Sequence, residues 1–313
     1  MKEIISLFRD NLEKIGLFFG TNAAPFKRTM ATQLTIRGHR FHFEAYEQVQ
    51  QAIKQQTKWY QLPRMNMSIT NSYYVHLVTA TNKHTAVADL FATEKLLKDV
   101  GFRRSVQSYL AALYIKNAGH AKKMDATSRA LKQQSSNKFA SPTLQLTAML
   151  SAREEMPEQL AEATEHYYST LRKDFKRGDQ LQHVTLMLTI IRGTFDAKLC
   201  DRIRELAQLI QQLNVKLQDR HYAVICLLAL ANFKKDDFPK LFALHEEIVT
   251  LLKANPKYEN TLLIAAQLYT ATQITEIEDN LFVDAGDLLF DMCGLMDSCG
   301  DGSDGGSDGG GGD

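Results

Sequence analysis

Aromatic and basic side chains are the residues of this chain best suited to bind a ligand, and they gather in three short segments. A ring beside a guanidinium can stack on a planar ligand or base, but sealing of the joint between two packed helices is the favoured interpretation here. Trp59 is the only tryptophan, and its neighbours predict a position between two helices. Six residues are therefore candidates for ligand or partner binding: Trp59, Tyr60, Arg64, Tyr73, Arg103 and Arg104.

The spacing of histidines and carboxylates does not predict a metal site. His39 and His42 are three residues apart, but no carboxylate or cysteine stands near enough in sequence to complete a ligand shell. The segment from Glu162 to His166 resembles one helix of a di-iron site, yet Ala163 stands where the Glu-x-x-His spacing needs an acid. We expect no bound metal and no cofactor.

Motifs for nucleophilic catalysis and phosphate binding are missing from the sequence. It contains no Gly-x-Ser-x-Gly elbow and no Gly-Lys-Ser/Thr loop. Cys200 and Cys226 are interpreted as helix-packing residues, whereas Cys293 and Cys299 lie in an acidic segment that disfavours the reactive thiolate. No residue is assigned a catalytic role, and we do not expect an enzyme.

An internal period of about 38 residues organises the chain. Each unit contains a short apolar segment, a polar break and a longer amphipathic stretch, a pattern typical of helical-repeat proteins. Leucines at the ends of the short segments recur at separations of 36, 37, 38, 40 and 40 residues: Leu77, Leu113, Leu150, Leu188, Leu228 and Leu268.

The longer stretches have a helical period. In the clearest one, Leu199, Ile203, Leu206 and Ile210 step by four and three residues, so they fall on one stripe of a helix. The shorter segments, such as residues 222–231, are apolar all round and require burial on several sides. We predict an all-α, solenoid-like stack of helical hairpins, with the shorter helices inside and a long concave surface. A compact irregular bundle of the same helices is the alternative.

The hairpins divide the chain into four predicted parts. Residues 1–60 are N-terminal helices that cap the array, residues 61–275 are the hairpin repeat array, and residues 276–300 are a C-terminal helix. From residue 301 the chain contains only Gly, Ser and Asp. Residues 301–313 are therefore predicted to be a disordered acidic tail, because they offer nothing to bury.

A near-neutral total charge hides an asymmetry. Lys and Arg number 37 and Asp and Glu 36, but twelve of the acids and none of the basic residues follow Lys257. Residues 1–257 therefore carry a net charge of +13, which favours contact with polyanions unless the lysines simply solvate outer helix faces. No apolar run has the length of a membrane span, and the opening residues lack a signal-peptide pattern. We expect a cytoplasmic protein without a membrane partner.

Two segments carry a pattern that is shared with a known family. In residues 53–64 an Ile-Lys and aromatic run precedes Arg64, and in residues 96–112 a Gly-Phe-Arg-Arg-Ser run precedes Tyr109 and an Ala-rich helix. In these features the chain resembles the bacterial family DUF4003, a domain of unknown function. It departs from the family at residues 139–144, where a Leu-Thr-Ser run and paired acids are expected. The resemblance supports the helical fold and implies no activity.

Three functions are compatible with these patterns. A non-catalytic protein-interaction or scaffold module is favoured, because a helical-repeat surface can hold a protein or peptide partner without a reactive residue. The alternative is a protein that binds nucleic acid or another polyanion through its basic body, modulated by the acidic tail. An enzyme site assembled from Tyr73, His76 and Arg104 has no supporting spacing.

Overall fold

Every regular element in the described part of the chain is a helix, which confirms the all-α prediction. The computed structural model describes residues 1–20, 24–134, 143–212, 217–219, 221–254 and 261–273. Seven helices lie on the outside: α1 (Lys2–Phe19), α3 (Phe43–Gln56), α6 (Lys83–Asp99), α8 (Ala118–Gln134), α10 (Pro157–Leu171), α12 (Ala197–Gln212) and α14 (Phe238–Leu252). Seven lie inside: α2 (Ala24–Ile36), α5 (Met67–Leu77), α7 (Val106–Ala111), α9 (Leu144–Ser151), α11 (Asp179–Arg192), α13 (His221–Leu230) and α15 (Thr261–Ala271). The short helix α4 (Leu62–Met65) and two 3-10 turns, Ala112–Tyr114 and Lys235–Asp237, complete the set.

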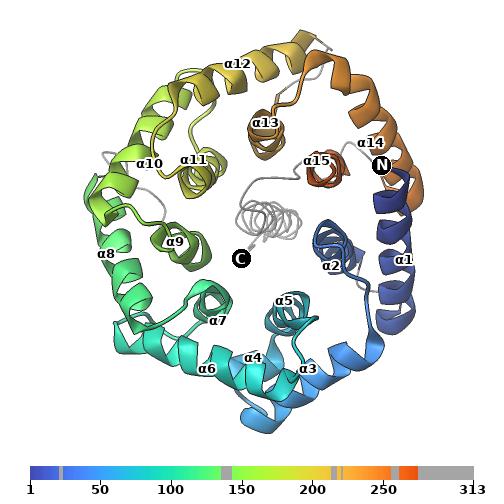
Figure 1. Ribbon diagram of the computed structural model, residues 1–313, viewed down its shortest axis with the longest axis vertical. Helices are drawn as coiled ribbons and strands as arrows, with labels where there is room; N and C mark the ends of the chain where they lie inside the picture. The colour runs from blue at the N-terminus through green and yellow to red at the C-terminus, as the bar shows by residue number, and fades with distance from the viewer. Residues whose placement is uncertain (21–23, 135–142, 213–216, 220, 255–260, 274–313) are drawn as a thin grey trace, which may run out of the picture.

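The hairpins are arranged in a closed ring (Figure 1). Each outer helix leads into an inner helix, and the first and last described hairpins meet, because α2 packs against α15. On the outside, Arg9 Nη2 of α1 lies 3.4 Å from Glu247 Oε1 of α14. The described hairpins thus form a closed ring, where the sequence analysis predicted a stack with a long concave surface.

The four predicted parts of the chain have different places in this structure. Residues 1–60 contribute α1, α2 and α3 to the ring, beside the helices of the predicted repeat array. The predicted C-terminal helix, residues 276–300, and the predicted tail, residues 301–313, lie outside the described residues.

The recurring leucines all lie on the inner side of the hairpins. Leu77 ends α5 and Leu113 sits in the 3-10 turn after α7, and both are half-buried. The other four are fully buried on inner helices: Leu150, Leu188, Leu228 and Leu268. An inner helix such as α11 is covered by its own outer helix, α10, and by the inner helices on both sides, α9 and α13. These three neighbours account for the burial of most side chains of α11.

The outer helices bury one stripe only. In α12 the predicted residues Leu199, Ile203, Leu206 and Ile210 are buried, while Asp201, Glu205 and Gln208 between them are exposed. The amphipathic stretches of the sequence therefore became the outer wall, whose charged face meets solvent.

Thr189, buried on the inner helix α11, has hydrogen-bond partners within the ring, whereas Nδ1 of His183 on the same helix is buried without one. Thr189 Oγ1 donates to the carbonyl of Thr185 in its own helix, at 2.9 Å, and accepts from Thr164 Oγ1 of α10, at 3.0 Å. Buried hydroxyl groups need such partners, since leaving one unpaired costs about 1 to 3 kcal/mol. These hydrogen bonds allow a polar residue to occupy the buried face of an inner helix, and the bond to Thr164 also joins α11 to its outer helix α10.

The two kinds of turn lie at opposite edges of the ring. Figure 1 looks along the ring axis and shows the inner helices nearly end-on, so each runs from one edge to the other. We call the edge where outer helices lead into inner helices the outer-to-inner edge. Neighbouring turns meet there, since Lys176 Nζ lies 3.8 Å from Asp219 Oδ2 of the next such turn. At the inner-to-outer edge, the Glu155 carboxylate lies against Gly193 of the next turn.

Truncation of a recurring leucine tests the inner ring. Leu188→Ala removes buried methyl groups at a site enclosed on all sides, so it should lower the free energy of unfolding by about 2 to 5 kcal/mol. Leu17→Ala, at a leucine that is 74% exposed on α1, is the matched control and should change it little. Urea unfolding measures both, and equal losses in the two variants would contradict the packing described here.

The stability of the ring should depend on pH through two histidines of the inner helices. Desolvation by burial lowers the pKa of His76 to about 3 and that of His183 to about 4. A histidine in an unfolded chain has a pKa of about 6.5, so below that pH the unfolded protein binds more protons. The free energy of unfolding should fall as the pH drops from about 6.5 toward 4, by on the order of 1 kcal/mol per histidine at pH 5.

Histidine variants separate this effect from general acid unfolding. His183→Gln should flatten the pH dependence of urea unfolding between pH 7 and pH 5, because glutamine does not titrate. His84→Gln, at an exposed histidine, should leave it unchanged. A pH profile that is the same in His183→Gln as in the wild type would exclude this role for His183.

Candidate partner-binding surface

The segment around Trp59 exposes apolar side chains between α3 and α5. Trp59 is 73% exposed and Met65 is 69% exposed. Nine large hydrophobic side chains are exposed in the described residues, and five of them fall within residues 59–67. Such clusters on a protein surface usually mark a place where something binds. We call this group the Trp59 patch, and its members are Trp59, Tyr60, Leu62, Met65 and Met67.

Short-range hydrogen bonds hold the patch on a fixed frame. The Lys58 amide donates to Gln61 Oε1 at 2.8 Å, and the Gln61 amide donates back to the Lys58 carbonyl at 3.0 Å. Pro63 is buried in the first turn of α4, where its missing N–H costs nothing. Asn66 Oδ1 then caps α5 by accepting from the Ser68 amide at 2.9 Å. The exposed side chains are therefore displayed by an ordered turn.

Two basic residues, Lys58 and Arg64, share the turn that carries the aromatic rings of the patch. The rings of Trp59 and Tyr60 meet edge to face, with centroids 5.8 Å apart. Lys58 Nζ lies 6.0 Å from the centre of the Tyr60 ring, and Arg64 Nη1 donates to the Thr57 carbonyl at 3.4 Å. Arg64 is exposed, so its remaining N–H groups face solvent.

Tyr73 does not share this surface. Its side chain is fully buried, and its hydroxyl donates to the Tyr109 carbonyl at 3.3 Å. Burial raises the pKa of Tyr73 far above its ordinary value, so the phenol stays protonated. Tyr73 therefore joins α5 to α7 in the core.

The two neighbouring arginines Arg103 and Arg104 have different surroundings. Arg103 is exposed. Arg104 binds Glu94 of α6 through Nε, at 3.2 and 3.1 Å, and through Nη2, at 2.9 Å. Glu94 is only 1% exposed and also accepts from Ser108 Oγ, at 3.2 Å. The hydrogen bonds to Glu94 raise the pKa of Arg104, and together these contacts fix the turn between α6 and α7.

The six sequence candidates thus separate into two groups. Trp59, Tyr60 and Arg64 are exposed in one turn, in and beside α4. Arg103 is also exposed, and it precedes α7, a helix that packs against α4. Tyr73 and Arg104 instead hold helices together. What sequence reasoning offered as one site is therefore an exposed surface with structural residues behind it.

The sequence analysis missed that the outer-to-inner edge as a whole is basic. In their described parts, its turns contain nine basic residues and two acidic ones, Asp174 and Asp219. The turns of the opposite edge contain six basic and five acidic residues. The nine are Lys58, Arg64, Arg103, Arg104, Arg172, Lys173, Lys176, Arg177 and Lys253. A signal was present, because each of these residues follows one of the longer amphipathic stretches.

Other residues considered for chemistry lie apart from this surface. Cys200 and Cys226 are buried, and desolvation raises the pKa of the Cys200 thiol to about 11. His245 Nε2 lies 2.9 Å from Thr261 Oγ1 and joins α14 to α15. Within the described ranges, His, Cys, Asp and Glu form no group of three or more able to hold a metal ion. Cys293 and Cys299 lie outside these ranges.

Comparison with known proteins identifies the family of the chain. A family model described as "Protein of unknown function (DUF4003)" matches residues 18–289, which include every hairpin of the ring except most of α1. The chain belongs to the DUF4003 family. The resemblance seen in residues 53–64 and 96–112 is thereby confirmed. No curated protein and no solved structure matches the chain.

The family is described only as a protein of unknown function, so it does not explain the Trp59 patch or the basic edge. None of the described helices is both long and apolar enough to cross a membrane. The helices that carry the exposed surface, α3 to α7, lie inside the part that matches the DUF4003 model.

Neighbouring arginines provide a test of the structural assignment. Arg104→Ala leaves Glu94 buried without its cation and should lower the free energy of unfolding by about 2 kcal/mol, less than for a fully buried pair because Arg104 is partly exposed. Adding Glu94→Gln should restore part of this loss, whereas Arg103→Ala alone should have almost no effect. Thermal unfolding measures the three variants, and equal effects of the two arginine changes would refute the assignment.

Proposed function

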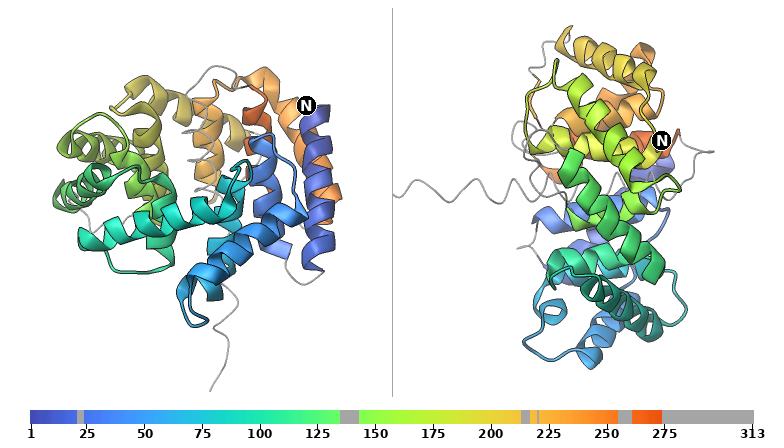
Figure 2. Two further views of the ribbon diagram at one scale, coloured as in Figure 1. Left: turned by 60° about the horizontal axis from the view of Figure 1, so that its bottom comes forward. Right: turned by 90° about the vertical axis from the view of Figure 1, so that its left-hand side faces the viewer.

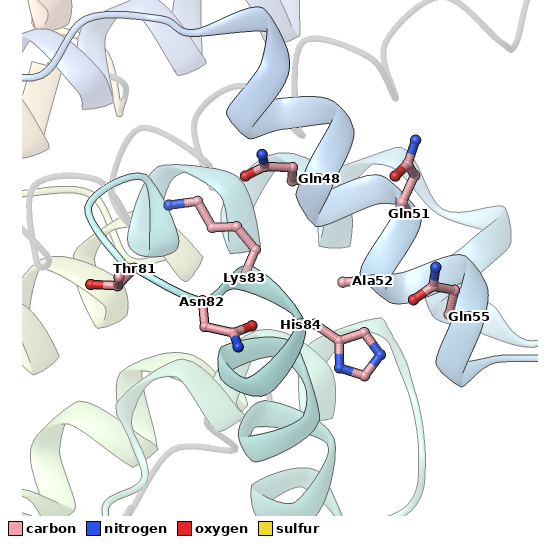
Figure 3. Close-up of a pocket in the computed structure, with 8 residues that line it drawn as sticks. All are labelled: Gln48, Gln51, Ala52, Gln55, Thr81, Asn82, Lys83 and His84. Atoms are coloured by element: carbon pink, nitrogen blue, oxygen red, sulfur yellow. The ribbon is translucent and has the colours of Figure 1, made fainter.

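We propose that this protein is a non-catalytic interaction module, a solenoid-like stack of hairpins closed on itself, which holds an extended segment of a partner protein in a groove on its outer wall. The observation that carries the proposal is a polar groove between α3 and the start of α6, with a volume of about 480 Å³ (Figure 3). It is lined by Gln48, Gln51, Ala52, Gln55, Thr81, Asn82, Lys83 and His84.

Three glutamines form one wall of the groove. Gln48, Gln51 and Gln55 are exposed, share one face of α3 and make no hydrogen bond to other described residues. Each amide offers two donors and an acceptor, the groups that pair with the N–H and C=O of a peptide main chain. At about 1.5 Å of rise per residue, the three span about 10 Å, the length of about three residues of an extended chain.

The opposite wall of the groove is fixed by the turn between α5 and α6. Lys83 Nζ donates to the carbonyls of Val78, at 2.8 Å, and Ala80, at 2.6 Å, at the end of α5. Gln56 Nε2 donates to the His84 carbonyl at 3.0 Å and joins α3 to α6. A groove held by such contacts needs little reorganisation on binding, which favours affinity.

Charge indicates the composition of the partner segment. No acidic residue occurs between Glu47 and Asp89, while Lys54, Lys58 and Lys83 fall within that stretch. A partner segment with acidic residues beside its groove-bound backbone would therefore meet complementary charge. The sequence analysis also considered a nucleic acid, but the free amides of α3 suit a peptide backbone better than a row of phosphates.

Selection of short random peptides on the immobilised full-length protein tests this function. Acidic peptides should be enriched, and the affinity of a selected synthetic peptide should fall by about tenfold or more in Gln51→Ala/Gln55→Ala, because two hydrogen bonds are lost. Gln211→Ala/Gln212→Ala, at two exposed glutamines of α12, is the matched control and should bind as the wild type does.

Two results would contradict the groove as the binding site. One is a set of selected peptides whose affinity is the same for the α3 double variant and the wild type. The other is an equal loss in the α12 control, which would indicate a general effect of removing glutamines. Thermal unfolding of all three proteins confirms that the comparison is made between folded chains.

A further inference from the structure

The Trp59 patch and the basic edge lie on the same side of the ring. Residues 57–66 form an outer-to-inner turn, as do residues 100–105 and 172–178. In these three turns eight basic residues accompany a single acid, Asp174, which Arg204 of α12 binds at 2.7 Å, and one of the eight, Arg104, is itself paired with Glu94. The apolar patch therefore belongs to a positively charged face (Figure 2 shows the ring from the side).

The composition of the patch distinguishes between anionic partners. A nucleic acid can stack its bases on Trp59 and Tyr60, but its phosphates and sugars offer nothing to Leu62, Met65 and Met67. A lipid bilayer offers something to all five, because aliphatic side chains enter the acyl boundary while Trp and Tyr rings stay at headgroup depth. Lys58 and Arg64 are exposed in the same turn, where they can pair with lipid phosphates.

We propose that the outer-to-inner edge is a docking face for an anionic lipid bilayer, with the Trp59 patch inserted into the interface and the basic turns lying on the headgroups. The sequence-based expectation of no membrane partner considered only spanning segments, whereas a surface-bound protein needs none. The face is separate from the proposed peptide groove, which lies on the outer wall between α3 and α6, so either proposal can fail without the other.

A single exposed segment is enough for reversible binding when charge assists it. Exposed apolar side chains of this size contribute by leaving water, and each Lys or Arg near an anionic surface contributes about fivefold in affinity. The turns 100–105 and 172–178 extend the charge across the edge, which orients the ring with its outer-to-inner side toward the lipid. The Trp59 patch would then determine how deeply the protein inserts into the bilayer, and the basic turns would determine how the ring is oriented on it.

The lone tryptophan makes the proposal directly measurable. We would mix the full-length protein with vesicles of phosphatidylcholine alone or with added phosphatidylglycerol, and record tryptophan emission and cosedimentation. Only the anionic vesicles should bind the protein and shift the emission of Trp59 to shorter wavelength, and added salt should reverse both. Lipids brominated near the headgroup should quench that emission.

Variants identify the face that binds. Met65→Ala/Met67→Ala keeps the fluorescent probe and should weaken binding by about tenfold. Lys58→Glu/Arg64→Glu should weaken it by more than about 25-fold. Met156→Ala removes an exposed methionine flanked by Glu155 and Glu158, and Lys234→Glu/Lys235→Glu reverses two charges at the opposite edge. These two controls should bind as the wild type does.

Three outcomes would overturn the proposal. The first is an unchanged Trp59 emission in anionic vesicles. The second is an equal loss of binding in the control variants, which would assign binding to overall charge. The third is a shift of Trp59 emission that single-stranded DNA causes at a lower concentration than anionic lipid does. That result would assign the face to nucleic acid. Every substituted residue is exposed, so each variant should fold as the wild type does. Thermal unfolding checks this for each variant.

Discussion

A stack of helical hairpins has two ends, and each end presents an apolar face that must be covered. This chain covers both by packing its first hairpin on the last described one, through α2 on α15 and the contact of Arg9 with Glu247. Closure allows helices as apolar as α13 to exist in the middle of the molecule, because every inner helix has a neighbour on both sides. The binding surfaces proposed here follow from it, since a ring offers an outer wall and two edges where an open stack offers a long inner groove.

The alternation of outer and inner helices sorts the turns into two sets. Turns of the same kind are separated by about one repeat in sequence but are neighbours in space, as Lys176 and Asp219 demonstrate. Basic residues that are far apart in sequence therefore lie at the same edge of the ring, because each follows an outer helix. The opposite edge has nearly balanced charges, with contacts such as that between Arg153 Nη2 and Glu155 Oε1, 3.1 Å apart. The two edges of one ring thus differ in chemistry.

Sequence reasoning could predict the helices and their inner or outer position, because these depend on local apolar periodicity, as in Leu199 to Ile210 of α12. It could not predict closure, which depends on the small rotation between successive hairpins and hence on side-chain sizes at many contacts. Tyr73 and Arg104 show the same limit at the level of the site. The burial of Tyr73 depends on α7, and Arg104, in the turn after α6, is held by Glu94, ten residues earlier on α6. The place of Trp59 between two helices was predictable from its neighbours, but its 73% exposure was not, because sealing of the joint between helices was the favoured interpretation.

The meeting of α1 with α14 also means that the ring has no structural beginning. Every inner helix packs against an inner helix on each side, and the contact of α2 with α15 is one of this series. On the outside of this seam, α1 and α14 meet through the ion pair of Arg9 with Glu247, whose side chains are both exposed. A closed ring of this kind therefore leaves none of the described inner helices as an exposed terminal layer.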